Sequence, residues 1–168
     1  MKNRTLTRMA LLTAVALIIF MVEAQIPSLV PVPGVKLGLA NIITIYAVFV
    51  LGPGPALMIL VSRVFLGSVF SGQMMTLFYS LGGGLLCWCV MCLLRRVVTE
   101  KQIWICSVFG AVAHNIGQML VAVVIARTPA LLSYLPVLMV SAVLTGAFTG
   151  FAAQFLLERL GEIKKRNG

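Results

Sequence analysis

Three polar side chains lie together inside an apolar run in the second half of the chain. They are His114, Asn115 and Gln118, within the stretch GAVAHNIGQML that covers residues 110–120. Positions three or four apart share one face of a helix, so these residues would form one polar face. That face could hydrogen-bond to neighbouring helices, contact a bound ligand, or hold a metal. The metal has the least support, because one histidine without nearby carboxylates or thiolates is a poor ligand set.

Three ionisable residues also lie inside or beside apolar runs, namely Glu23, Lys36 and Arg63. Charged groups within a membrane are costly, and they are usually paired or functional. Arg63 therefore has two readings. It is either a structural partner of Glu23 or of backbone carbonyls, or a counter-charge for an anionic substrate.

The composition identifies the medium that surrounds these residues. The chain of 168 residues is 61% hydrophobic and only 10% charged, whereas an ordinary soluble domain is roughly 25% charged. Such a chain has too few polar groups to cover a water-facing surface, so the bilayer is its natural solvent. The net charge of +9 does not indicate nucleic-acid binding, because the basic residues flank apolar runs and do not alternate with aromatic ones.

The apolar runs predict an all-α integral membrane protein, a single domain with a compact bundle of six transmembrane helices. A span needs about 20 residues. The six predicted spans cover about 6–26, 37–51, 55–71, 74–94, 103–126 and 131–157. The sequence Gly52-Pro53-Gly54-Pro55 predicts a tight turn between the second and third spans. The alternative is a single re-entrant hairpin over these two short runs.

The distribution of basic residues predicts the orientation. With six spans both termini lie on one side, and ten of the thirteen basic residues fall on that side, near the termini and in the 95–101 loop. Cytoplasmic segments carry such an excess, so both termini are expected in the cytoplasm. The first span also resembles a signal peptide, with Val22-Glu23-Ala24 in place of a cleavage site. We interpret it as a retained span, with cleavage as the alternative.

Small residues at helical spacing mark three segments. Gly146 and Gly150 predict close packing of the last span against its neighbours. Gly82–Gly84 are not followed by the Lys-Ser/Thr of a phosphate loop, so they predict close packing or local bending instead. Ala10 and Ala14, four apart on the first span, can either pack internally or dock a partner helix.

The four cysteines do not form a recognisable metal motif. Cys87, Cys89 and Cys92 lie on one predicted helix, and only Cys106 could complete a set of four. Metal sites favour Cys-x2-Cys pairs on turns. We therefore interpret these cysteines as small apolar residues and expect no metal and no cofactor.

Several longer stretches resemble a known family. They are VPVPGVKLGLANI (31–43), LGPGPAL (51–57), FYSLGGG (78–84), GAVAHNIGQ (110–118) and YLPVLMVSAVLTGAFTG (134–150). Together they are similar to the bacterial Gx transporter family, whose members are often labelled heptaprenyl diphosphate synthase component I. That family in turn resembles the six-span substrate-binding (S) components of energy-coupling factor vitamin transporters.

The resemblance implies a bundle in the bacterial cytoplasmic membrane with a substrate pocket that opens outward. In S components, the loop after the first span closes over the pocket, and here that loop would be residues 27–36. An Ala-x-x-x-Ala pattern on the first span docks against a transmembrane coupling subunit that works with ATPases. Ala10 and Ala14 match that pattern.

The synthase label can be compared with the chemistry that prenyl diphosphate synthesis requires. That reaction uses clusters of carboxylates, typically Asp-rich, to hold Mg²⁺ against a diphosphate. The chain contains no Asp and only four Glu residues. The composition thus argues against an enzyme and leaves room for a non-catalytic accessory role in isoprenoid or quinone metabolism, including membrane redox chemistry.

The sequence therefore predicts a membrane-embedded substrate-binding protein for uptake of a small nutrient or cofactor precursor, energised by a separate complex. Lys36 and Arg63 would receive anionic groups of the substrate, and Tyr79 and Tyr134 could stack on a ring. The full set of expected substrate-binding residues is Glu23, Lys36, Asn41, Arg63, Tyr79, His114, Asn115, Gln118 and Tyr134.

Overall fold

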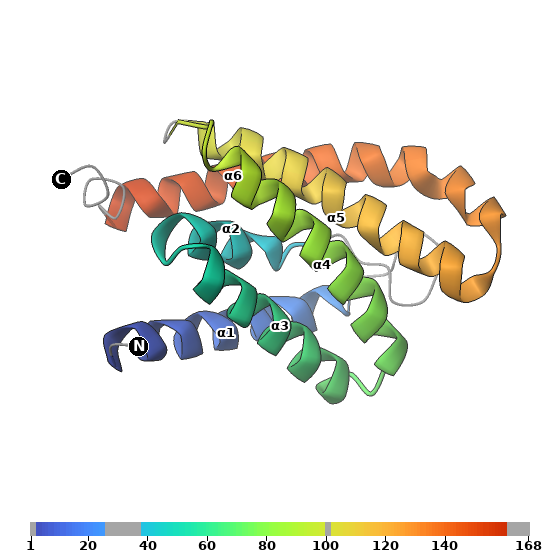
Figure 1. Ribbon diagram of the computed structural model, residues 1–168, viewed down its shortest axis with the longest axis horizontal. Coiled ribbons are helices and arrows are strands. Elements are labelled where there is room, and N and C mark those ends of the chain that lie inside the picture. The colour runs from blue at the N-terminus through green and yellow to red at the C-terminus, as the bar shows by residue number, and fades with distance from the viewer. Residues whose placement is uncertain (1–2, 26–37, 100–101, 161–168) are drawn as a thin grey trace.

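The protein is a bundle of α-helices (Figure 1). The computed structural model describes residues 3–25, 38–99 and 102–160. The helices are α1 (Asn3–Glu23), α2 (Asn41–Val50), α3 (Pro53–Phe70), α4 (Met74–Leu94), α5 (Ile103–Ala126) and α6 (Leu135–Leu160), with the short 3-10 helix η2 (Pro129–Tyr134) before α6. No strand occurs in these ranges. The predicted all-α membrane fold is confirmed.

Five of the helices are long and apolar enough to cross a membrane, namely α1, α3, α4, α5 and the η2–α6 unit. The predicted spans 74–94 and 103–126 coincide with α4 and α5. The predicted 37–51 span is different, because α2 has only ten residues. At 1.5 Å per residue α2 is about 15 Å long, half of the roughly 30 Å hydrocarbon core.

The short α2 lies at the centre of the bundle, in contact with all five longer helices. It starts late because Gly38 has φ 81, a left-handed conformation that cannot continue a helix. It ends at the turn formed by Leu51 and Gly52, where Gly52 has φ 99. Pro53 and Pro55 then lie in the first turn of α3, where a proline costs no helical hydrogen bond. The predicted turn is thus shifted to just before the two prolines.

The distribution of side chains is the reverse of that in a soluble protein. Polar and charged side chains such as Arg63, His114, Asn115 and Gln118 are buried in the bundle. Large apolar side chains are exposed along the outer faces of the helices, for example Leu11, Ile18, Phe65, Leu120, Val140 and Phe148. This arrangement suits a hydrocarbon solvent, in which polar groups must find partners inside the protein.

Glycines bring α4 and α5 into direct backbone contact. A Cβ atom on Gly117 would lie 2.7 Å from the carbonyl oxygen of Gly82 and 2.8 Å from Cα of Gly83. A Cβ atom on Gly83 would lie 2.6 Å from the carbonyl oxygen of His114. The prediction of close packing at Gly82–Gly84 is confirmed, and the physical reason is that only glycine lets helix backbones approach so closely.

Glycines also allow close packing of α6 against α5. A Cβ atom on Gly146 would lie 2.8 Å from Cα of Val108, and one on Gly150 would lie 2.6 Å from Cα of Trp104. The predicted internal packing of the last span is therefore confirmed. Next to this contact, the Trp104 ring stacks on Phe151 with centroids 5.5 Å apart.

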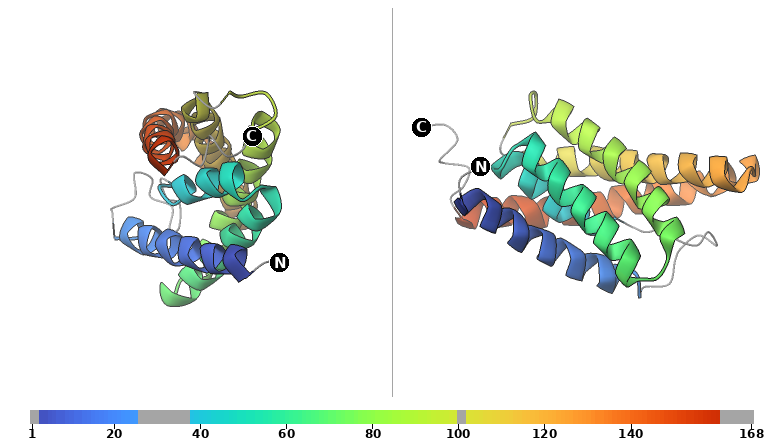
Figure 2. Two further views of the ribbon diagram at one scale, coloured as in Figure 1. Left: turned by 90° about the vertical axis from the view of Figure 1, so that its left-hand side faces the viewer. Right: turned by 60° about the horizontal axis from the view of Figure 1, so that its bottom comes forward.

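The bundle has two distinct ends. The start of α1, the α2–α3 turn, the end of α4 and the end of α6 lie at one end, as both figures show (Figures 1 and 2). We call this the basic end, because the adjoining helix ends carry Arg4, Arg8, Arg95, Arg96 and Arg159. The α3–α4 turn and the α5–η2 connection lie at the opposite end.

Candidate functional site

Glu23, the last residue of α1, is buried and reaches across to the segment before α2. Its Oε1 atom accepts a hydrogen bond from the backbone N–H of Gly38. A hydrogen bond from a backbone N–H satisfies part of the acceptor capacity of this buried carboxyl group. This contact ties the end of α1 to the start of α2.

Arg63 enters the same region from the middle of α3. Its Nη2 donates to Oδ1 of Asn41, the first residue of α2, over 3.1 Å, and both side chains are buried. The Arg63 guanidinium also interacts electrostatically with the Glu23 carboxylate. This interaction agrees with the reading of Arg63 as a structural partner of Glu23, and the counter-charge reading stays a prediction.

His114 approaches the cluster from α5. A Cβ atom on Gly38 would lie 3.0 Å from Cδ2 of His114 and 2.8 Å from Nδ2 of Asn41. The glycine backbone therefore fits between these two side chains, with a positive φ that other residues rarely adopt. Four helices, α1, α2, α3 and α5, thus contribute to one buried group, which we call the central polar cluster: Glu23, Gly38, Asn41, Arg63 and His114.

Several polar atoms of this region lack a hydrogen-bond partner within the described part of the chain. They are Nδ2 of Asn41, Nε of Arg63 and Nδ1 of His114, together with Oγ1 of Thr44. Nδ1 of His114 faces Gly83 on α4, where an added Cβ atom would lie 3.1 Å from it. Each such buried atom costs about 1–3 kcal/mol if it stays unpaired. Unpaired polar atoms contributed by three helices, α2, α3 and α5, are what a small polar ligand would use.

Thr44 was not predicted from the sequence. It is buried in α2, and it lies three residues after Asn41, on the same helix face. The signal was present, since Asn41-x-x-Thr44 repeats the spacing that singled out Asn115 and Gln118. Gly38 was also missed, because its contribution is a backbone N–H that no side-chain pattern reveals.

Asn115 and Gln118 make contacts within the bundle. Nδ2 of Asn115 donates to the carbonyl oxygen of Leu138 on α6 over 2.9 Å, and Nε2 of Gln118 donates to Oδ1 of Asn115 over 3.4 Å. This pattern corresponds to the interhelical alternative for this polar face. A ligand-binding role for these two residues stays a prediction.

An Asn115→Leu substitution should lower stability by about 1 kcal/mol, because it removes one interhelical hydrogen bond of the kind measured in membrane proteins. The control is Gln154→Leu on α6, a half-buried residue whose amide donates to the exposed Glu158 of the same helix and not to a neighbouring helix. Thermal unfolding of both variants in one detergent gives the comparison. Equal melting temperatures for the two variants would show that the Leu138 contact contributes nothing.

The remaining predicted residues lie away from the central polar cluster or outside the described residues. Tyr79 is buried with Met119, Ala122 and Leu138 in a separate apolar group. Tyr134 ends η2 and is 37% exposed. Lys36 and the predicted 27–36 loop lie outside the described residues. The proposed stacking by Tyr79 and Tyr134 stays a prediction.

Ala10 and Ala14 are both exposed on the outer face of α1. They do not pack inside this bundle, which leaves the partner-docking alternative for them. The docking itself stays a prediction.

The cysteines occupy different environments. Cys87 and Cys106 are buried, Cys92 is half-buried and Cys89 is exposed, and all four are free thiols. Within the described ranges, no three residues among His, Cys, Asp and Glu are grouped so that they could hold a metal ion. Cys87 packs next to Met91 of its own helix, with its sulfur 3.8 Å from the Met91 sulfur. These contacts are those of small core residues.

The comparisons with known proteins add one assignment. Comparisons with curated proteins and with solved structures gave no match. The sequence model of one family, described as heptaprenyl diphosphate synthase component I, matches residues 12–156. The match begins in the first half of α1, includes the whole central polar cluster and ends near the end of α6. The chain therefore belongs to the heptaprenyl diphosphate synthase component I family.

Proposed function

We propose that this chain is a membrane-embedded substrate-binding component that takes up a small nutrient or cofactor precursor with the help of a separate energising complex. The observation that carries the proposal is the central polar cluster, in which buried side chains of α2, α3 and α5 leave polar atoms unpaired. A purely structural network would be expected to satisfy these atoms internally. A ligand with both hydrogen-bonding and anionic groups fits this set.

In this proposal, Arg63 receives an anionic group of the substrate, and Lys36 assists from the segment before α2. His114 and Asn41 exchange hydrogen bonds with neutral groups. The excess of basic residues at one end of the bundle supports a cytoplasmic location for both termini. Since His114 lies eleven residues into α5, or about 17 Å from its start, the substrate would bind near the middle of a bacterial cytoplasmic membrane.

The test uses a substitution that should not harm the unliganded fold. Thr44→Val removes a buried hydroxyl that has no described partner, so stability should stay equal or rise. Native mass spectrometry of the purified wild-type protein is expected to show a retained polar small molecule, and its affinity should fall about tenfold in Thr44→Val. Thr145→Val on α6, whose hydroxyl donates to the Ser141 carbonyl, is the control. An affinity that is the same in both variants and also in Arg63→Ala would place the ligand elsewhere.

A second function is supported by the description of the family, which names one component of heptaprenyl diphosphate synthase. In this alternative the chain is a non-catalytic membrane subunit in isoprenoid or quinone metabolism. It predicts co-purification with a soluble prenyl synthase in mild detergent and a retained prenyl lipid. The first function predicts co-purification with a coupling subunit and ATPases, so a single pull-down distinguishes the two.

A further inference from the structure

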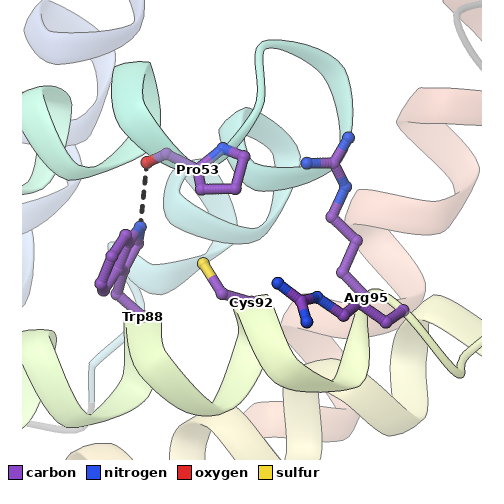
Figure 3. A pocket seen from close by; sticks show the side chains of 5 residues that line it. Pro53, Trp88, Cys92 and Arg95 are labelled. Atoms are coloured by element: carbon purple, nitrogen blue, oxygen red, sulfur yellow. Dashed lines mark hydrogen bonds between the residues drawn. The ribbon is translucent and has the colours of Figure 1, made fainter.

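A pocket of about 400 Å³ lies at the basic end, where the α2–α3 turn meets the end of α4 (Figure 3). Its lining residues are Pro53, Trp88, Cys92, Arg95 and Arg96. The indole Nε1 of Trp88 donates to the Pro53 carbonyl oxygen over 3.0 Å, which joins α4 to the first turn of α3. The pocket is therefore built on two helices.

Two guanidinium groups supply the charge of this pocket. Arg95 is half-buried, and a Cβ atom on Gly52 would lie 3.9 Å from its Nη1, so its side chain extends toward the α2–α3 turn. Arg96 lines the same pocket, and none of the lining residues is acidic. Planar guanidinium groups bind phosphate oxygens in a bidentate manner. The first turn of α3, which begins at Pro53, adds the positive end of a helix dipole.

The other lining groups are apolar. Trp88, Pro53 and Cys92 form a wall beside the arginines, as Figure 3 shows. A volume of this size lies within the range of about 300–1,000 Å³ found for small-molecule sites. The pocket can thus hold a phosphate group together with the first part of an apolar substituent.

The position of the pocket also favours a chain-bearing phosphate. It lies at the end of α4 and at the start of α3, two helices long enough to cross the membrane, so it lies near the membrane surface. Tryptophan is enriched at that level, and basic pockets between helices there bind lipid head groups.

We propose that this pocket binds the phosphate group of an anionic molecule that carries an apolar chain. The site lies at the end of the bundle, apart from the central polar cluster, and it is independent of the proposed uptake function. The phosphate could belong to a phospholipid of the bilayer or to a soluble phosphate ester, and the experiment separates these sources.

Trp88 serves as the reporter in the test. The chain has two tryptophans, so a Trp104→Phe variant leaves Trp88 as the only emitter. This protein is placed in phosphatidylcholine nanodiscs, and its emission is followed while the phosphatidylglycerol content is raised or while inorganic diphosphate is added. Native mass spectrometry of the wild-type protein counts bound phosphatidylglycerol independently of Trp104.

We expect a saturable change in Trp88 emission with at least one of the two probes. The apparent affinity should fall about tenfold or more in the Arg95→Gln/Arg96→Gln variant, because each guanidinium supplies charge-assisted hydrogen bonds. The control is Arg159→Gln, which removes a charge at the same end of the bundle, where Arg159 lies over the Phe155 ring of α6. It should change the affinity less than twofold.

Each outcome of these measurements either supports or contradicts the proposed phosphate site. Saturation with phosphatidylglycerol alone identifies a lipid head group, and saturation with diphosphate alone identifies a soluble phosphate. If neither probe gives saturation, or if the double variant and Arg159→Gln behave alike in emission and in mass spectrometry, the proposal is wrong.

Discussion

A Gly117→Val variant is expected to unfold at a much lower temperature than the wild-type protein. The added Cβ would lie 2.7 Å from the Gly82 carbonyl oxygen and 2.8 Å from Cα of Gly83. Both neighbours are backbone atoms that cannot rotate away, so α4 and α5 must separate. Overpacking of this kind costs about 1–3 kcal/mol or more. Circular dichroism during heating in a mild detergent measures the shift.

Gly54→Ala is the matched control for this variant. Gly54 lies in the first turn of α3, and a Cβ atom there would meet nothing within 4 Å. Alanine also has the higher helix propensity, by about 1 kcal/mol. The control should therefore melt at the wild-type temperature or slightly above it. If Gly117→Val were as stable as Gly54→Ala, the close α4–α5 contact would be incorrect.

The second large effect is expected for Arg63→Met. This substitution removes the guanidinium that donates to Asn41 and that interacts electrostatically with Glu23. Removal of one member of a buried charge pair costs about 3–5 kcal/mol, because the other charge stays buried without compensation. The variant should show a large fall in melting temperature and weaker retention of the proposed ligand.

The double variant Glu23→Gln/Arg63→Met tests whether the loss of stability comes from the Glu23 charge that Arg63→Met leaves uncompensated. A glutamine can still accept the hydrogen bond from the Gly38 N–H, while no charge remains buried. The double variant is therefore expected to recover about 1–3 kcal/mol relative to Arg63→Met, a coupling typical of residues in one network. A double variant that is less stable than Arg63→Met would show that the two charges do not compensate each other.

Hydropathy located most of the helices, because each long helix must match the thickness of the hydrocarbon core. The predicted spans at 74–94 and 103–126 coincide with α4 and α5, and the predicted last span, 131–157, covers most of η2 and of α6. The 37–51 run could not be predicted in the same way. It is apolar because α2 is enclosed by the other helices, and not because it must cross the bilayer.

Burial of the candidate polar residues also followed from the sequence, since a polar group in an apolar run must face the protein interior. The hydrogen-bond partners of these groups could not be predicted from the sequence, because they lie far away along the chain. Asn41 and Arg63 are 22 residues apart, and Asn115 bonds to a carbonyl on α6. The pocket beside Trp88 and Arg95 was not predicted at all, because it depends on how α3 begins next to the end of α4.

The sequence by itself determined the solvent and the class of this protein. Too few charges to cover a water-facing surface, together with apolar runs of membrane length, permit an all-α membrane bundle and little else. Only the tertiary structure decided which polar groups meet. Glycine contacts set the distance between α4 and α5, and the positive φ of Gly38 delays the start of α2, while the Gly38 backbone N–H donates to Glu23. These contacts join distant segments, and their geometry depends on packing that no local pattern encodes.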